Sequence, residues 1–499
     1  MDVFLIPDHY SPNDVITLLE KQHAMTKEQS FESHFSLLDT MDWRLYQAGY
    51  RLEVYENHSA LLLIDAMHPL ITLPFCKLIA SAKDLEPLLS DRIGPLLGNR
   101  SLFSRANLHF YSSGYKILDS QNQASVALTL DTLNMLDILA PPIHVVRFVP
   151  LQESKVEIEK VKKTLLDSGL KISAHSIYEQ IFRTLDIQPG TYKSKVMPKL
   201  TKRMTVEKAA AVIFKELNEV SQANIKGVIQ DIDNEFLHDF RTSIRRTRSA
   251  LSLFKNHLNV SCTHFRKEFR HLGKRSNKLR DLDVFLENQK YIHSLLPEDL
   301  SKGLFPFFED LQAHRSIEHK KVAKTLSGKR FSHLQTEWSG FIKHLLQNPS
   351  NTLIKEVADQ IIYKKYSKVL EMGTALSENS SNDEFHRLRI QCKKLRYALE
   401  FFYHLYPVKN ISRQIKILKS LQDHLGLLND KHVHSAYLLQ IINSHPAPSI
   451  LTAASLGGVI TRLHADSITL RREFEKVWSV FKKTALLKQV QQLYGSNSE

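Results

Sequence analysis

The sequence has few cysteines, and no two of them lie close together. Cys76, Cys262 and Cys392 are the only three among 499 residues, and they form no CxxC pair. This spacing excludes a disulfide framework and favours a reducing compartment. No apolar run approaches the roughly 18 residues that a membrane-spanning helix needs. No basic segment followed by a long apolar stretch opens the chain, so we expect a cytoplasmic protein without a secretory signal.

Motifs of common enzyme classes are also missing. The sequence has no GxxxxGK phosphate loop, no HExxH zinc pair and no GxSxG nucleophile elbow. Its 24 histidines form no cluster with metal-ligand spacing. We therefore predict no catalytic residue, no metal and no cofactor. The absence of these motifs favours a binding protein over an enzyme.

Proline is unevenly distributed, because eleven of the seventeen prolines lie at or before Pro198. The N-terminal part has strand-like stretches at Tyr50–Tyr55, 61–64, 109–111, 144–149 and 155–159, and helical patterns near 11–23 and 159–168. We predict an α+β domain over residues 1–190, followed by a polar, proline-containing linker over 191–204.

From residue 205 onward nearly the whole sequence has helical periodicity. We predict helices near 206–230, 234–257, 263–292, 305–345, 351–377, 383–405, 410–443 and 450–487, with prolines in the gaps. Two related sets of helices predict an all-α domain over 205–490. It would consist of two pseudo-twofold-related four-helix bundles, at about 205–345 and 351–487.

Two of these predicted helices share the pattern His-x-x-Arg-x-x-x-basic-x-x-Arg. The first copy is His238, Arg241, Arg245 and Arg248, and the second is His386, Arg389, Lys393 and Arg396. Offsets of 0, 3, 7 and 10 fall on one face of a helix. Each helix therefore presents a stripe of cations, which is electrostatically costly unless an anion lies against it.

The repetition extends beyond the charged positions. Asp281 aligns with Asp430, and the repeat length is about 148 residues, too long for a solenoid unit. Apolar or small residues precede the basic ones in both copies, so each helix has an apolar seam for packing beside its cationic face. These seams are Leu237, Phe240, Ile244, Thr247, Leu251 and Phe254, then Phe385, Leu388, Cys392, Leu395, Leu399 and Phe402.

The excess positive charge belongs to the repeats. The chain carries +14, while residues 238–283 have a balance of +8 and residues 386–431 a balance of +7, so the remainder is close to neutral. Such clustering indicates a polyanionic partner. Further cations at helical spacing join from the next helix of each copy, namely Arg270, Lys274, Lys278 and Arg280, then Arg413, Lys416 and Lys419.

The stretches HDFRTSIRRTRSALSLF and HRLRIQCKKLRYALEFF, followed by LRDLDVF and LQDHLGLLND, resemble the CHAD family (conserved histidine α-helical domain) over roughly residues 200–490. The resemblance implies two four-helix bundles around a basic groove that binds inorganic polyphosphate, and association with polyphosphate granules. It implies no catalytic constellation. The implied ligand contacts are His238, Arg241, Arg245, Arg246, Arg248, His386, Arg389, Lys393, Lys394 and Arg396.

Residues 37–64 resemble part of the CYTH family, the triphosphate tunnel hydrolase fold. The rest of that family's pattern is poor, because its N-terminal Glu-x-Glu-x-Lys is missing. Glu53 and Tyr55 stand where the family alternates arginines, and residues 61–65 offer no tunnel lysine. The resemblance therefore implies a degenerate, inactive CYTH-like domain.

Two alternatives stay open at this point. A divergent metal-dependent triphosphatase could act through the CYTH-like domain, where Glu157 and Glu159 would lie on an inward-facing strand. A nucleic-acid-binding protein would also use basic helices, but no nucleic-acid module is recognisable. Other polyanions are possible partners for the same stripes.

Overall fold

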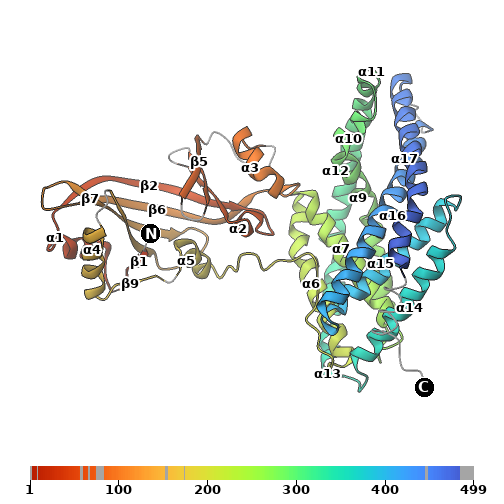
Figure 1. Ribbon diagram of the computed structural model, residues 1–499, viewed down its shortest axis with the longest axis horizontal. Coiled ribbons are helices and arrows are strands. Elements are labelled where there is room, and N and C mark those ends of the chain that lie inside the picture. The colour runs from red at the N-terminus through yellow and green to blue at the C-terminus, as the bar shows by residue number, and fades with distance from the viewer. Residues whose placement is uncertain are drawn as a thin grey trace. The chain divides into compact units, whose positions relative to one another are not determined.

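The computed structural model describes residues 3–7, 9–56, 60–65, 68–74, 84–151, 155–173, 175–443 and 448–483. The chain divides into two compact units, Met1–Lys193 and Ser194–Glu499. Strands are gathered in the first unit and long helices in the second (Figure 1). The predicted fold class, an α+β region followed by an all-α region, is confirmed.

The N-terminal unit is built on an antiparallel sheet. In the part of the chain that the structure describes, the strand order is β5-β4-β3-β2-β6-β7-β8-β1-β9. The two longest strands, β2 and β6, pair along most of their length. The strands are β1 (Val3–Leu5), β2 (Met25–Asp39), β3 (Tyr50–Tyr55), β4 (Ala60–Asp65), β5 (His68–Pro74), β6 (Phe103–Leu118), β7 (Ala124–Met135), β8 (Ile143–Pro150) and β9 (Lys171–Ile172).

Five helices of the described N-terminal residues pack on this sheet: α1 (Pro12–Glu20), α2 (Arg44–Gln47), α3 (Pro87–Leu97), α4 (Lys155–Asp167) and α5 (Ile177–Thr184). Successive residues of a strand point to opposite faces, and β3 shows the result. Leu52 and Val54 join the core beneath α3, whereas Tyr55 packs with Phe35 in the core that α5 completes through Phe182. This β-rich region is consistent with a CYTH-like fold.

The predicted strand at 155–159 is wrong, because these residues begin helix α4. The alternation of charge that suggested a strand also fits a helix whose charged residues lie three apart. Lys160 Nζ contacts Glu157 Oε1 at 2.7 Å, and Lys162 Nζ contacts Glu159 Oε1 at 3.1 Å. The apolar residues Val161 and Leu165 are fully buried on the other side.

The second unit contains the repeated helices. The first repeat comprises α6 (Val206–Gln230), α7 (Asn234–Phe254), α8 (Thr263–Arg275), α9 (Asn277–Glu287), α10 (Gln289–Ser294), α11 (Glu298–Ser301), α12 (Phe305–Leu326) and α13 (Lys329–Gln347). The second comprises α14 (Ile354–Thr374), α15 (Asn382–Phe401), α16 (Val408–Ile442) and α17 (Ile450–Lys482). Short 3-10 turns lie at Lys302–Leu304 and Tyr403–Leu405.

The helix positions predicted from periodicity agree closely with the structure, except that two predicted helices of the first repeat are divided. The first break lies at Ser276, whose hydroxyl bonds back to the Leu272 carbonyl at 3.0 Å. The second lies at Asn288, between α9 and α10. The third lies at Ser327 and Gly328, and glycine is a weak helix former. The corresponding helices of the second repeat, α16 and α17, are continuous.

The two repeats begin side by side. Thr205 and Leu353 form an isolated antiparallel bridge just before α6 and α14. Val206 N donates to Thr352 O at 3.0 Å, and Ile354 N donates to Met204 O at 2.9 Å. The bridged residues are separated by the repeat length of about 148 residues, so equivalent positions pair with each other.

A shared core joins the repeats farther along the helices. Leu282 of α9 and Leu311 of α12 are packed in one cluster with Leu438 of α16 and Leu456 of α17. In the described residues, no helix combines the length and the apolar character needed to cross a membrane.

Candidate functional site: a cationic cavity pair between two repeated helices

The two cationic stripes lie on α7 and α15, which pack against each other. Both helices begin with a side-chain cap that fixes their register. Asp233 accepts bonds from the first-turn amides of α7, and Ser381 forms a capping box with Glu384 at the start of α15. The predicted apolar seams are buried in both helices, from Leu237 to Phe254 and from Phe385 to Phe402. The opposite, basic faces line two adjoining cavities.

The two cavities have volumes of about 550 Å³ each and share one set of cations. The shared residues are Arg245 and Arg248 of α7 and Arg389 and Lys393 of α15. Cavity A is further lined by Ser249, Ser252, Leu253, Lys255, Arg266, Arg270, Lys365, Ile390, Lys394 and Tyr397. Cavity B is further lined by His238, Arg241, Thr242, Ile244, Gly273, Asn277, Arg280, Asp281, Val284, Phe285, Asn429, Asp430, Val433 and His434.

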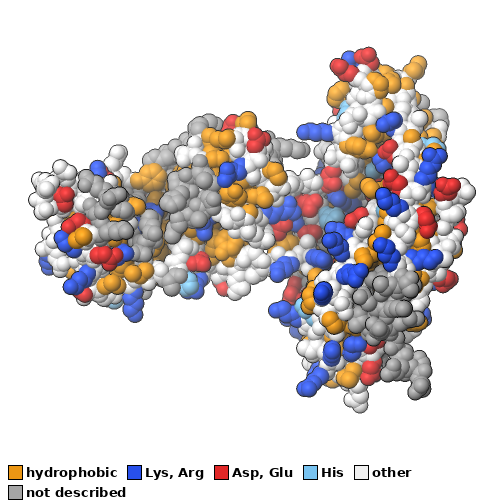
Figure 2. Space-filling model, viewed as in Figure 1, with side chains coloured by type: hydrophobic (Ala, Val, Ile, Leu, Met, Phe, Trp, Pro, Cys, Tyr) orange, Lys and Arg blue, Asp and Glu red, His pale blue; other side chains and the backbone are white. Residues whose placement is uncertain are grey.

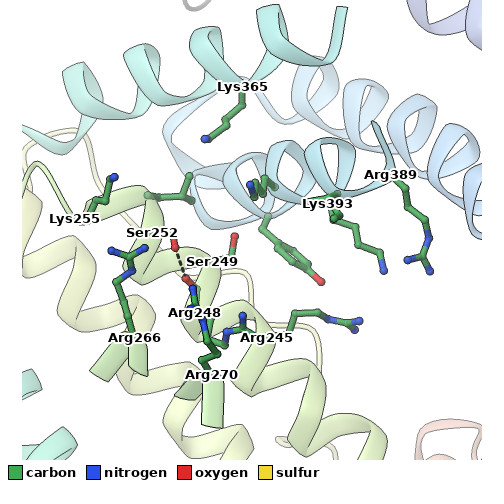
Figure 3. Close-up of a pocket in the computed structure, with 14 residues that line it drawn as sticks. Arg245, Arg248, Ser249, Ser252, Lys255, Arg266, Arg270, Lys365, Arg389 and Lys393 are labelled. Carbon is green, nitrogen blue, oxygen red and sulfur yellow. Dashed lines mark hydrogen bonds between the residues drawn. The ribbon is translucent and has the colours of Figure 1, made fainter. Parts of the chain in front are cut away.

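Cavity A receives cations from several helices. Arg245, Arg248 and Arg270 of the first repeat face Lys393 and Arg389 of the second, and Lys365 enters from α14 (Figure 3). Lysine and arginine side chains are also numerous on the visible surface of the helical unit (Figure 2). Positive charge is therefore concentrated from several directions on one hollow.

Burial and the neighbouring like charges lower the pKa values of the central residues. Burial, followed by the neighbouring Arg245 and Arg389, lowers the pKa of Lys393 to about 7. Burial and then Arg270 lower the pKa of Arg248. Arg389 has a lowered pKa from burial too, opposed by Asp430, whose carboxylate lies 3.8 Å away. An anionic ligand would relieve this repulsion.

Arg241 is fixed by hydrogen bonds of its own. Its Nη1 donates to the Ser276 hydroxyl at 2.7 Å and to the Gly273 carbonyl at 3.1 Å, and Nη2 donates to Asn277 Oδ1 at 2.9 Å. Burial lowers its pKa to about 10, so it remains charged at neutral pH. The break between α8 and α9 thus holds a guanidinium at the wall of cavity B.

The two stripe histidines differ. His238 lines cavity B, and burial followed by Arg280 lowers its pKa, so its ring is neutral at neutral pH. His386 lies outside the lining of both cavities, and its Nδ1 bonds to Asn429 Oδ1. Asn429 itself lines cavity B. We infer that His386 orients a cavity residue.

Arg246 does not face the cavities. It is 3% exposed, and its guanidinium donates to Glu400 Oε2 of α15 and to the Val196 carbonyl. Its charge is therefore neutralised inside the protein, and the implied role of Arg246 as a ligand contact is corrected to a structural one. The motif suggested a contact because Arg246 follows a stripe residue, but helical geometry turns it about 100° away.

The other predicted contacts are divided between the cavities and the surface. Lys394 and Arg270 line cavity A. Arg396 lies 3.7 Å from Glu400 Oε1 and lines neither described cavity. The remaining cations, Lys274, Lys278, Arg413, Lys416 and Lys419, are exposed and also outside both linings, and Lys278 pairs with Glu318 at 3.3 Å.

Three cations that line cavity A are not among the ligand contacts predicted from the sequence. Lys255 continues the stripe of α7 seven residues after Arg248, so its position could have been recognised. Arg266 lies four residues before Arg270 on the same helix face. Lys365 belongs to α14, whose pattern shares nothing with the stripes, and no sequence signal pointed to it.

The N-terminal unit has a different interior. Glu53 is 3% exposed and accepts hydrogen bonds from Tyr55 at 2.8 Å and from Tyr178 of α5. Burial raises the pKa of Glu53 despite these bonds. Phe35, Phe110 and other apolar residues occupy the same side of the sheet. Within the described ranges, no group of three or more His, Cys, Asp or Glu residues could hold a metal ion.

Comparison with known proteins supports the fold of the helical unit. Residues 212–439 match the family model described as CHAD domain. The crystal structure of the CHAD domain from the plant Ricinus communis is similar, with a TM-score of 0.51 and 23% identity over 57% of this chain and 95% of that chain. PptA from Streptomyces chartreusis is similar with a TM-score of 0.43 and 17% identity, over 58% of this chain and 99% of that one. No curated protein matches the chain.

Proposed function

The helical unit contains a CHAD domain at residues 212–439, and we propose that it binds inorganic polyphosphate without cleaving it. One observation carries the proposal: the two adjoining cavities share four cations, two from each repeat. Among the described residues, no carboxylate lies within 4.0 Å of the charged nitrogens of Arg245, Arg248 or Lys393. Their charge is thus left for an external anion.

The chemistry of the lining suits phosphate oxygens. Arginine offers a planar fork of donors that matches two oxyanions, and lysine adds a mobile point charge. The shared residues connect cavity A to cavity B, so an extended anionic chain could pass from one to the other while it contacts both repeats. Association with polyphosphate granules would follow from such binding.

Charge reversal at the centre tests the proposal. We expect the Arg245→Glu, Lys393→Glu double variant to lose at least about a hundredfold in affinity for long-chain polyphosphate, because two attractions become repulsions. A matched control is Lys320→Glu with Lys343→Glu, which changes the same net charge at exposed positions outside both cavities. Equal binding by the two double variants in a titration would refute a role for the groove.

Competition separates polyphosphate from nucleic acid. Long-chain polyphosphate should displace single-stranded RNA or DNA from the protein at a far lower phosphate concentration than the reverse. Displacement that is equally effective in both directions would favour a general polyanion receptor. Stronger displacement by nucleic acid would favour the nucleic-acid alternative.

A further inference from the structure

The internal repeat relates the buried site around Arg246 to the wall of cavity A around Lys394. Arg246 corresponds to Lys394 when the sequences are shifted by the repeat length of about 148 residues. Arg246 reaches Glu400 by an ion pair, and its guanidinium carbon lies 5.4 Å and 5.0 Å from the ring centres of Tyr397 and Phe401. Apart from the Val196 carbonyl, these partners of its guanidinium all belong to α15 of the other repeat.

The same shift gives the residues expected around Lys394. Tyr397 corresponds to Ser249, Glu400 to Ser252 and Phe401 to Leu253. All three equivalents line cavity A together with Lys394. Each is smaller than its counterpart, and the one carboxylate of the set is replaced by a hydroxyl. In cavity A, therefore, Lys394 has no equivalent of the Glu400 carboxylate that pairs with Arg246.

The surroundings of Lys394 have also gained positive charge. Lys365 corresponds to Leu217, which is fully buried in the first repeat, and Lys255 corresponds to Tyr403. Burial, then Lys394, Lys364 and Lys255, lower the pKa of Lys365. Among the described residues, no carboxylate lies within 4.0 Å of the ammonium groups of Lys255, Lys365 or Lys394.

A further polar group in cavity A has no partner. The Ser249 hydroxyl oxygen is buried and makes no hydrogen bond to any group in the described part of the protein. A buried hydroxyl without a partner costs free energy, and a ligand oxygen can satisfy it. By contrast, the Ser252 hydroxyl donates to the Arg248 carbonyl at 2.9 Å and stands at an exposed position.

We propose that cavity A contains a discrete phosphoryl subsite around Lys394, in which a phosphate group of the ligand takes the place that Glu400 fills in the other half. Lys394, Lys365 and Lys255 supply the charge, and Ser249 supplies a neutral donor. The inference rests on the proposed polyphosphate binding and deepens it, because the two halves then contribute unequally. A short chain such as tripolyphosphate should bind here, since one half of the site is closed by Arg246 and Glu400.

Ser252→Glu tests the subsite by restoring the missing carboxylate beside Lys394. We expect this variant to bind tripolyphosphate at least about tenfold more weakly than the wild type, because the new carboxylate pairs with Lys394 and repels the ligand. Ser252→Gln is the matched control, since it adds the same volume without charge; it should bind tripolyphosphate several-fold more tightly than Ser252→Glu. Ser249→Ala should weaken binding several-fold through loss of one hydrogen bond to a charged group.

Titration calorimetry of the full chain with tripolyphosphate and with long-chain polyphosphate separates the outcomes. Equal affinities of Ser252→Glu and Ser252→Gln for tripolyphosphate would overturn the subsite. Wild-type binding of long chains but not of tripolyphosphate would overturn the subsite and leave the proposed function intact. Charge-sensitive binding of tripolyphosphate without binding of long chains would support the subsite and overturn the proposed function. Binding of neither ligand would overturn both.

Discussion

Arg246 of the first repeat and Glu400 of the second form a buried ion pair, with Nη1 and Oε2 2.5 Å apart and both side chains 4% exposed. The pair crosses from α7 to α15 and so joins the two repeats in the interior. The Val196 carbonyl accepts a second bond from Arg246. Removal of Glu400 would leave the buried Arg246 without a carboxylate, whereas removal of Arg246 would leave Glu400 with Arg396, 3.7 Å away.

Glu400→Gln should therefore destabilise the helical unit by about 3–5 kcal/mol, the usual cost of breaking a buried pair from one side. Chemical denaturation followed by circular dichroism measures this loss. Replacement of both partners, as in Arg246→Met with Glu400→Leu, should recover most of the stability because no charge remains buried. A loss below about 1 kcal/mol in Glu400→Gln would contradict this account.

The affinity for polyphosphate should fall as the pH rises through neutrality. Lys393 has a pKa of about 7, so it is charged below that value and loses its charge above it. His238 and His434 also face cavity B, and burial lowers the pKa of both rings from the usual 6.5, so they lose their protons at a lower pH than Lys393 does. Binding measured from pH 6 to 8.5 should weaken several-fold in the wild type and much less in Lys393→Arg, which stays charged.

The same residue should make the ligand-free protein more stable as the pH rises from about 7 to 10.5. The pKa of Lys393 is lowered in the folded protein from 10.5 to about 7. Between these values the unfolded chain binds more protons than the folded one, and stability then increases with pH. Lys393→Met should flatten this part of the curve of melting temperature against pH. An unchanged curve would show that Lys393 is not desolvated.

Binding should depend strongly on salt, and each groove cation should contribute to the slope. A cation that neutralises a phosphate releases a counterion, and its loss reduces the slope of log K against log salt by about one. We expect this reduction for Arg245→Gln. The exposed Lys320→Gln should leave the slope unchanged, so a comparison of the two slopes identifies the charges that face the ligand.

Gly373→Ala should destabilise the second repeat without altering the cavities. An added Cβ on this buried glycine of α14 would overlap the ring of Trp478 on α17. Overpacking of this kind costs about 1–3 kcal/mol. Gly340→Ala on α13 is the matched control, because nothing lies within 4 Å of the added atom. Similar melting temperatures for the two variants would contradict the close packing of α14 against α17.

The N-terminal unit should not release orthophosphate from tripolyphosphate with Mg²⁺ or Mn²⁺. Glu157 and Glu159, the carboxylates considered for a metal, lie on helix α4 and pair with lysines. A malachite-green assay measures the released orthophosphate across a range of Mg²⁺ and Mn²⁺ concentrations. Release that disappears in Glu157→Gln with Glu159→Gln would establish the triphosphatase alternative instead.

Much of the helical unit could be predicted because its periodicity is regular and occurs twice. The limits of α6, α14 and α16 agree with the predicted ones within three residues. Breaks at Ser276 and Gly328 could not be predicted, because the hydrophobic period continues across them. The break at Ser276 involves the serine hydroxyl, which bonds back to the Leu272 carbonyl, and the break at Gly328 involves glycine, a weak helix former.

The N-terminal unit was harder to predict because strand signals are short. Only residues 109–111 of the long strand β6 were identified, although alternate residues along its length are buried. Polar residues such as Ser112 and Ser113 interrupt the apolar alternation. Ser112 is accommodated by a hydrogen bond to Asp131 of β7, at 2.6 Å, which forms only when the two strands pair.

The cationic stripes predicted the site, but not which cations reach it. Arg245, Arg389 and Lys393 line both cavities, as their helix face suggested. The direction of Arg246 is decided by Glu400, which belongs to the other repeat. Contacts between the repeats depend on how α7 and α15 cross. The periodicity of residues within one helix does not determine how that helix crosses another.

The bridge between Thr205 and Leu353 bears on the kind of chain that the groove can accept. Two equivalent positions that pair antiparallel place the pseudo-twofold axis between them, and such an axis exchanges Arg241 with Arg389 and Arg245 with Lys393. Near the axis, a ligand therefore meets similar groups whether it enters from one end or the other. An inorganic polyphosphate chain has no direction and reads the same both ways, whereas a nucleic acid strand runs from 5′ to 3′. The fold is thus suited to a linear anion that lacks chain polarity.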